Sequence, residues 1–134
     1  MVKDLVWDRV LSVQVEEIDE DHRRLVGLFN ILKHAVEEGD TADYIAAVLE
    51  ELISCTVWHF RHEERLMLKF GFQGLPEHRQ EHQELIESVR TLQQKFLQHD
   101  KPVSGEDIDF LEHWLTGHIL TADMELGAYL CMVM

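Results

Sequence analysis

Apolar side chains recur at intervals of three and four along most of the chain, which is the spacing of one face of an α-helix. The pattern predicts four helices, at about 19–36, 41–70, 76–97 and from 104 to beyond 123. The breaks between them are short and contain glycine or proline, which are typical of helix ends and helix starts.

Short connections force neighbouring helices to reverse direction, so the predicted fold is all-α: an antiparallel up-down-up-down four-helix bundle with an N-terminal arm. The length favours a single domain over 1–134, with the arm at 1–18, the bundle at about 19–127 and a tail at 128–134. The arm is apolar but too short for a bundle helix, so we expect it to pack across the helices.

The charge balance is strongly acidic, with 12 Lys and Arg against 26 Asp and Glu, a net charge of −14. Such a surface repels phosphate backbones and anionic lipid, so we expect no nucleic-acid partner and no membrane insertion. The chain has no apolar run of membrane-spanning length and no signal-peptide pattern, which favours a cytoplasmic protein. Cys55 and Cys131 lack metal-type spacing and are predicted to be reduced thiols, Cys55 as a buried apolar filler.

Several polar side chains interrupt the apolar stripes, where an ordinary core would exclude them, and a buried carboxylate is costly unless something neutralises it. His59 and Glu63 are four residues apart, as are His78 and His82, which places each pair on one helix face. One such pair arises often by chance, but here all four predicted helices contribute. The candidate metal ligands are His22, His59, Glu63, His78, His82, His118 and Asp123.

Seven such groups are too many for one ion, and the lack of thiolate argues against a structural zinc site. They indicate two ions. Imidazole with carboxylate suits iron or manganese, and helical bundles host paired iron, so iron is favoured. One pair does not fit: His118 and Asp123 are five residues apart, which is about 140° around a regular helix.

Four stretches of the chain, VEEIDEDH, WHFRHEE, HRQEH and HILTAD, resemble the hemerythrin family, specifically its single-domain bacterial members. The resemblance spans nearly the whole chain and implies two iron ions joined by an oxo or hydroxo bridge. It assigns one iron to His78, His82 and His118, the other to His22 and His59, and makes Glu63 and Asp123 bridging ligands. The first iron would then have six ligands and the second five, which leaves one position for dioxygen.

The resemblance also implies reversible binding of dioxygen, for oxygen transport, storage or delivery, by a protein that is not an enzyme. Imidazoles outnumber carboxylates among the candidate ligands, whereas oxidising di-iron enzymes use mostly carboxylates, which favours carrying oxygen over consuming it. Leu126 stands where animal members of the family have a tyrosine. The residues expected to line an apolar oxygen pocket are Phe60, Trp114, Leu115 and Ile119.

Two other functions could use the same centre. A sensor of oxygen or redox state would need an output module or a partner, and we expect the chain to work as a free domain. A di-iron enzyme, such as a peroxidase, nitric oxide reductase or iron oxidase, would need a proton donor near the open iron, and the sequence offers no candidate acid there. A protein acceptor of oxygen is a further expected partner, of unspecified identity.

The remaining polar features have simpler interpretations. His34, His62, His99 and His113 lie among polar neighbours or off the inner stripe and are predicted to be solvated. The acidic run within 16–21 is interpreted as a charged helix start, favourable at the positive end of the helix dipole.

Overall fold

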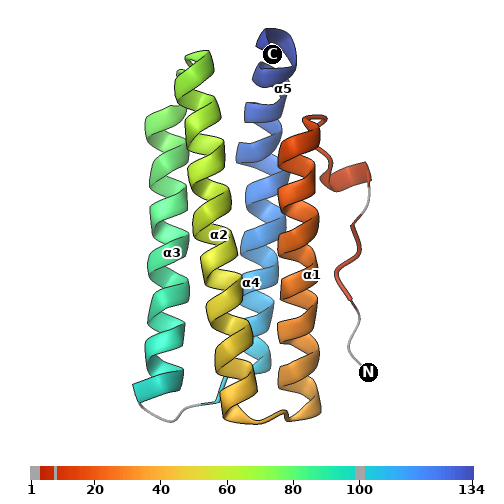
Figure 1. Cartoon of the computed structure of the whole chain (residues 1–134), viewed down its shortest axis with the longest axis vertical. Helices are drawn as coiled ribbons and strands as arrows, with labels where there is room; N and C mark the ends of the chain where they lie inside the picture. Colours follow the sequence, from red (N-terminus) through yellow and green to blue (C-terminus); the bar gives the residue numbers. More distant parts are fainter. Residues whose placement is uncertain (1–3, 8, 99–101) are drawn as a thin grey trace.

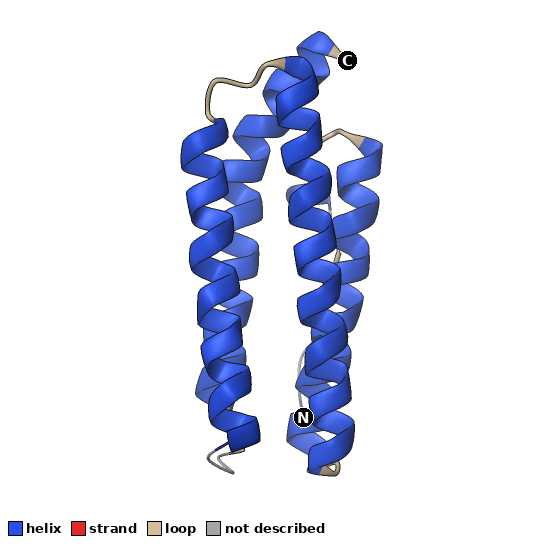
Figure 2. Cartoon of the chain, turned by 60° about the vertical axis from the view of Figure 1, so that its left-hand side comes forward, coloured by secondary structure: helices blue, strands red, loops and turns tan. Residues whose placement is uncertain are grey.

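Long helices joined by short turns run antiparallel to one another (Figure 1). The computed structural model describes residues 4–7, 9–98 and 102–134. The elements are a short 3-10 turn (Arg9–Leu11), α1 (Glu16–Glu38), α2 (Ala42–Phe70), α3 (Leu75–Gln98), and a fourth column made of α4 (Gly105–His118), a π-helical segment (Ile119–Asp123) and α5 (Met124–Val133). Within the described ranges the regular structure is entirely helical (Figure 2), which confirms the predicted all-α up-down-up-down bundle.

The ends of the helices follow from local chemistry. Gly39 and Gly71 end α1 and α2 with φ angles of 69° and 66°, a left-handed conformation that costs glycine little. Ser104 and Asp107 begin α4 with a reciprocal capping box, in which each side chain accepts from the other residue's backbone N–H. These defined helix ends keep the loops short, and short loops place neighbouring helices antiparallel.

The apolar core is divided into two clusters along the bundle. One contains Leu25, Phe29 and Leu85, and the other contains Ile18 and Leu126. On every helical column the candidate ligands lie between residues of the first cluster and residues of the second. A polar layer therefore crosses the bundle with apolar packing on both sides.

The segment before α1 packs against the end of the fourth column, as expected for an arm. Leu11, Val13 and Val15 are buried. A Cβ on Gly127 would lie 2.4 Å from the carbonyl oxygen of Val13, so only glycine permits this approach.

Two boundaries differ from the prediction. α1 begins at Glu16, ahead of the predicted 19, because Val13 and Ser12 bond the Asp19 carboxylate and hold the first turn in place. Residues 128–133 belong to α5, and Leu130 is buried in the second cluster, so the predicted tail is mostly helix. No helix in the described part of the chain combines the length and the apolar character needed to cross a bilayer.

Candidate metal centre

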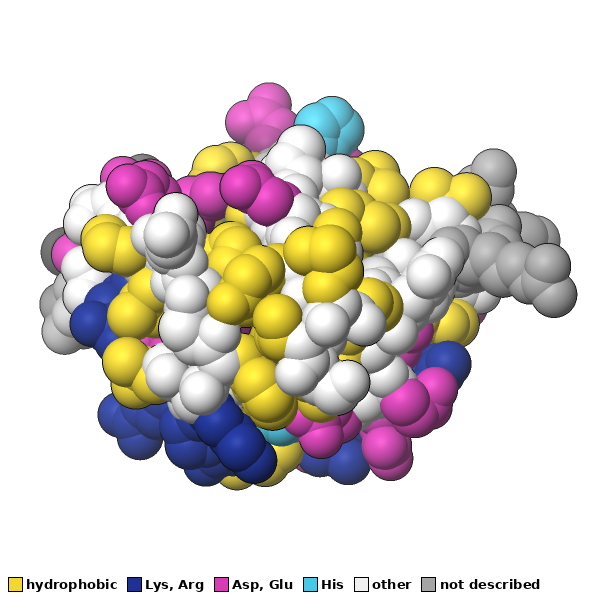
Figure 3. All heavy atoms as spheres, turned by 90° about the horizontal axis from the view of Figure 1, so that it is seen from above, with side chains coloured by type: hydrophobic (Ala, Val, Ile, Leu, Met, Phe, Trp, Pro, Cys, Tyr) yellow, Lys and Arg dark blue, Asp and Glu magenta, His cyan; other side chains and the backbone are white. Residues whose placement is uncertain are grey.

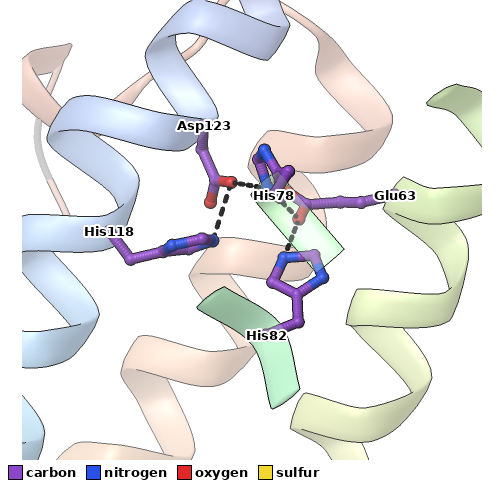
Figure 4. A group of neighbouring side chains, drawn as sticks. All are labelled: Glu63, His78, His82, His118 and Asp123. Carbon is purple, nitrogen blue, oxygen red and sulfur yellow. Dashed lines mark ion pairs between the residues drawn. The ribbon is translucent and has the colours of Figure 1, made fainter. Parts of the chain in front are cut away.

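All seven candidate ligands meet in the polar layer. His22 comes from α1, His59 and Glu63 from α2, His78 and His82 from α3, His118 from the end of α4 and Asp123 from the end of the π-helical segment. Each is at most 4% exposed. Figure 4 shows five of them, with the two carboxylates pointing toward the imidazoles. The structure thus brings together every group that the sequence analysis selected.

One set of donor atoms contains three imidazole nitrogens and two carboxylate oxygens. Oε1 of Glu63 lies 3.0 Å from Nε2 of His82 and 3.4 Å from Nε2 of His78. Oδ1 of Asp123 lies 3.0 Å from Nε2 of His78 and 3.0 Å from Nε2 of His118. These five atoms lie within 4.8 Å of one another, as ligands of a single ion would.

The other oxygen of each carboxylate belongs to a second, smaller set. Oδ2 of Asp123 lies 2.9 Å from Nε2 of His22, and Oε2 of Glu63 lies 3.2 Å from Nε2 of His59. This set offers two imidazoles where the first offers three. Glu63 and Asp123 therefore each face both sets, which is the geometry of bridging ligands.

The donor atoms have no hydrogen-bond partners within the protein. Ten buried side-chain nitrogen and oxygen atoms lack a hydrogen bond in the described part of the chain, and all ten belong to these seven residues. Buried polar atoms are nearly always satisfied, because leaving one unpaired costs about 1–3 kcal/mol. A pair of cations would satisfy nine of them at once, so the residues fit two metal ions.

The π-helical segment explains how His118 and Asp123 share a site. In this segment the backbone N–H of Met124 donates to the carbonyl oxygen of Ile119, five residues earlier. The wider turn brings residues five apart onto one face, where an α-helix would separate them, and such turns occur often at functional sites. The sequence analysis did not foresee this turn, although the spacing of two buried polar groups was its signal.

Carboxylates outside the layer hold three of the imidazoles by their other nitrogen. Nδ1 of His82 lies 3.1 Å from Glu64 and Nδ1 of His118 lies 3.2 Å from Glu81. Nδ1 of His59 lies 2.9 Å from Asp21. Because a carboxylate accepts, each Nδ1 carries a proton, which leaves Nε2 as the atom that would bind a metal ion, an arrangement typical of metal-binding histidine.

Asp21 and His62 differ from the sequence interpretation. Asp21, interpreted as part of a charged helix start, is buried, and its Oδ2 accepts from His59 and also from Nδ1 of His62 at 2.5 Å. His62, expected to be solvated, is only 14% exposed. The alignment of Asp21 with Ile18 and Leu25 on one helix face was an available signal.

The other secondary predictions have mixed outcomes. His113 is exposed, as predicted. His34 is partly exposed and pairs with Asp4, whereas His99 lies outside the described residues. Cys55 and Cys131 are both free thiols; Cys55 is half-buried and packs against the first core cluster.

The electrostatics of the metal-free layer favour charged pairs. Burial opposes charge on His59 and His78, but the Glu63 and Asp123 carboxylates outweigh it and raise the pKa of each imidazole to about 10. Burial likewise works against ionised Glu63 and Asp123, yet the surrounding imidazoles hold the pKa of both carboxyls below the usual range. Without metal, protons on the imidazoles balance the carboxylates.

An apolar cavity of about 40 Å³ opens on the smaller donor set. It is bounded there by His22, His59 and Asp123. All four residues predicted to line a pocket contribute to its wall: Phe60, Trp114, Leu115 and Ile119. The volume exceeds the roughly 10–15 Å³ that one water needs, so a diatomic molecule fits beside these donors.

Comparisons with known proteins agree with this geometry. The family model described as the hemerythrin HHE cation binding domain matches residues 13–130. The chain is 33% identical to myohemerythrin of Riftia pachyptila over 90% of this chain and 88% of that protein. It is 35% identical to bacteriohemerythrin of Pseudomonas paraeruginosa over 89% and 76% of the two chains. A crystal structure of wild-type hemerythrin superposes with a TM-score of 0.88 at 28% identity, over 94% of this chain and 97% of the other.

Proposed function

The chain belongs to the hemerythrin family, and on that premise we propose that it binds dioxygen reversibly at a di-iron centre and serves in oxygen transport, storage or delivery. In this proposal His78, His82 and His118 hold one iron, and His22 and His59 hold the other. Glu63 and Asp123 bridge the two, together with an oxo or hydroxo group. When bound, the iron pair supplies the electrons for reversible binding of dioxygen at the iron with fewer protein donors.

The unequal donor sets carry the proposal. Both imidazoles of the smaller set line the cavity, whereas His118 is the one imidazole of the larger set that does, and the shared Asp123 lines it too. A ligand entering the cavity therefore meets the ion that has room for one more donor. An open coordination position that faces a cavity distinguishes an oxygen-binding centre from a structural metal site, in which the protein fills every coordination position.

The cavity wall favours holding a ligand over transforming it. Among the described residues that line the cavity, the ionisable side chains are all proposed metal ligands. The hydroxyl of Thr56 is engaged, because it donates to the carbonyl oxygen of Leu52 at 2.7 Å. The wall therefore offers no free acid that could deliver a proton to bound oxygen, and its apolar residues keep water away from the centre.

The carboxylates that accept from the Nδ1 atoms of the imidazoles also support reversible oxygen binding. Asp21, Glu64 and Glu81 each fix one ring by accepting from its Nδ1. The rings therefore keep their orientation when the charge of the centre changes. This lowers the free-energy cost of converting between the oxygen-free and the oxygen-bound form.

Anaerobic reconstitution with ferrous iron, followed by exposure to air, tests the proposal. We expect two irons per chain and a visible absorption band that appears with oxygen, fades when oxygen is removed and returns on readmission. Immediate and permanent oxidation of the iron would contradict a carrier and favour an enzyme.

A further inference from the structure

Three cations in one row on the outer face of α2 make no ion pair with any described residue. Arg61, Arg65 and Lys69 are exposed and follow one another at intervals of four, so they share one side of the helix. Four other cations have carboxylate partners: Arg23 pairs with Glu16, Lys33 with Glu112, Arg79 with Glu64 and Arg90 with Glu50. Arg24 and Lys95 are exposed and also make no ion pair with a described residue, but they stand on other helices and form no row. Given 26 acidic residues in the chain, this unneutralised row is a distinct local surface.

Seen from the end of the bundle where α2 terminates, the Lys and Arg side chains are unevenly distributed (Figure 3). In Figure 3 a group of Lys and Arg side chains gathers at the lower left, while the others at the lower right lie beside acidic side chains. The row on α2 is therefore a local positive strip on an acidic chain. An acidic partner would be attracted to this strip and repelled by the flanking regions, which fixes where it docks.

Two apolar side chains extend the same strip. Trp58 is 49% exposed and Leu68 is 62% exposed, and the positions 58, 61, 65 and 68 follow one helix face. Exposed Trp beside Arg is the composition of interface residues that carry most of the binding energy. We call Trp58, Arg61, Arg65, Leu68 and Lys69 the α2 surface.

A chain of direct contacts links this surface to the proposed metal centre. The ring centroids of Trp58 and His62 are 5.4 Å apart. His62 Nδ1 lies 2.5 Å from Oδ2 of Asp21, and the same oxygen lies 2.9 Å from Nδ1 of His59. His59 in turn presents Nε2 to the smaller donor set. Only three side chains separate a partner at Trp58 from the donor set that faces the cavity.

We propose that the α2 surface docks an acidic one-electron carrier protein, which reduces the iron pair after it has become oxidised, through Trp58, His62, Asp21 and His59. This inference rests on the proposed di-iron function. Two reduced carriers each lose one electron and two ferric ions each gain one, while the bridging oxygen takes up a proton from water.

Other partners fit the surface less well. A nucleic acid or an anionic membrane presents charge over an area far wider than one helix face, and the flanking carboxylates of this chain would repel it. A basic protein would be attracted to the acidic remainder of the surface and not to the α2 surface. A compact acidic patch with an apolar centre matches both the charge and the exposed Trp58.

Binding to oxidised flavodoxin, an acidic one-electron carrier, tests the docking step on the iron-loaded protein. Arg65→Glu should weaken binding on the order of tenfold at low salt, since it reverses a charge within the strip. Lys95→Glu is the matched control, because it changes the net charge equally from an exposed site on α3, and it should change binding by less than about twofold. Equal effects of the two variants, or tighter binding of cytochrome c or anionic vesicles that ignores Arg65→Glu, would overturn the proposal.

The rate of reduction of the diferric protein by reduced flavodoxin tests the route. His62→Phe should slow reduction at saturating flavodoxin by on the order of tenfold while leaving the flavodoxin affinity unchanged. Dithionite, which is small and needs no docking surface, should reduce His62→Phe and the parent protein at similar rates, which excludes damage to the centre. Parallel slowing with both reductants would contradict the route.

Measuring the iron content and the reversible oxygenation of every preparation distinguishes a failure of the proposed function from a failure of the docking proposal. A sample without two irons or without reversible oxygen binding counts against the proposed function. A sample with both, but with no difference between Arg65→Glu and Lys95→Glu, counts against the α2 surface alone.

Discussion

Nε2 of His118 lies 3.0 Å from Oδ1 of Asp123, although five residues separate them along the fourth column. One widened turn over Ile119–Asp123 makes this contact and turns two residues of a helix into neighbouring donors. The same turn delivers Asp123 to a position between the two imidazole sets, where its second oxygen lies 2.9 Å from Nε2 of His22. The bridging role proposed for Asp123 therefore depends on a local departure from the α-helix.

Replacing a bridging carboxylate by its amide should disrupt metal binding. Asp123→Asn and Glu63→Gln keep the side-chain shape but remove the negative charge that faces both donor sets. We expect iron affinity to fall by about 100-fold or more and the bound iron to fall below two per chain. Equilibrium dialysis with ferrous iron under anaerobic conditions measures this. Glu125→Gln is the control, because Glu125 is exposed two residues further on, and it should bind iron normally.

Removing the metal should destabilise the fold. Nine of the ten unsatisfied buried atoms of the polar layer would gain a metal ion as partner. Iron held at a thousand times its dissociation constant would add about 4 kcal/mol to the free energy of unfolding, which raises the melting temperature by roughly 10 °C or more in a domain of this size. Calorimetry of chelator-treated and iron-loaded protein checks this, and identical melting temperatures would argue against a buried centre.

Iron uptake should release protons, and iron affinity should rise with pH. In the metal-free protein the pKa of His59 and of His78 is raised to about 10, because the carboxylates outweigh the effect of burial. At neutral pH these imidazoles carry protons that a metal must displace, so each step down in pH weakens binding. The stabilisation that these raised pKa values give the metal-free fold is complete below about 6.5 and disappears as the pH rises through about 10.

Proton release can be counted directly. An anaerobic titration of unbuffered metal-free protein with ferrous iron at neutral pH should acidify the solution by more than one proton per chain. Binding without proton release would mean that the imidazoles are already neutral, contrary to the electrostatics of the layer.

Opening the cavity wall should shorten the life of the oxygenated protein. Ile119→Ala removes a buried side chain from the wall, which admits water to the smaller donor set and should accelerate irreversible oxidation of the iron. The same change costs about 2–5 kcal/mol of stability. Leu130→Ala is the matched control: Leu130 is equally buried and belongs to the same core cluster, but it does not line the cavity. It should lose similar stability while oxidation, followed by visible absorption, keeps its original rate.

Much of the fold could be predicted because its determinants are local. The three-and-four spacing of apolar residues reports each helix, and Gly39, Gly71 and Ser104 mark where helices end or begin. The pairs His59 with Glu63 and His78 with His82 were accessible for the same reason, since a four-residue spacing has a fixed meaning on an α-helix.

The parts of the site that could not be predicted depend on contacts that the spacing of residues along the chain does not reveal. Asp123 was selected as a polar residue in an apolar stripe, but its pairing with His118 rested on the resemblance, because an isolated π-helical turn has no clear pattern of apolar positions. Asp21 was interpreted as part of a charged helix start, yet its carboxylate accepts hydrogen bonds from His59 and His62 of the neighbouring helix. Its role follows from the packing of α1 on α2, which is a property of the folded bundle.

The stoichiometry and reversibility of oxygen uptake test the central claim most directly. Iron-loaded ferrous protein is titrated with dioxygen, returned to an oxygen-free atmosphere and titrated again, with uptake and visible absorption recorded together. The account predicts one dioxygen per pair of irons, full release, and the same uptake in the second cycle. Uptake that continues beyond this ratio, or irons that stay oxidised after the first cycle, would contradict it.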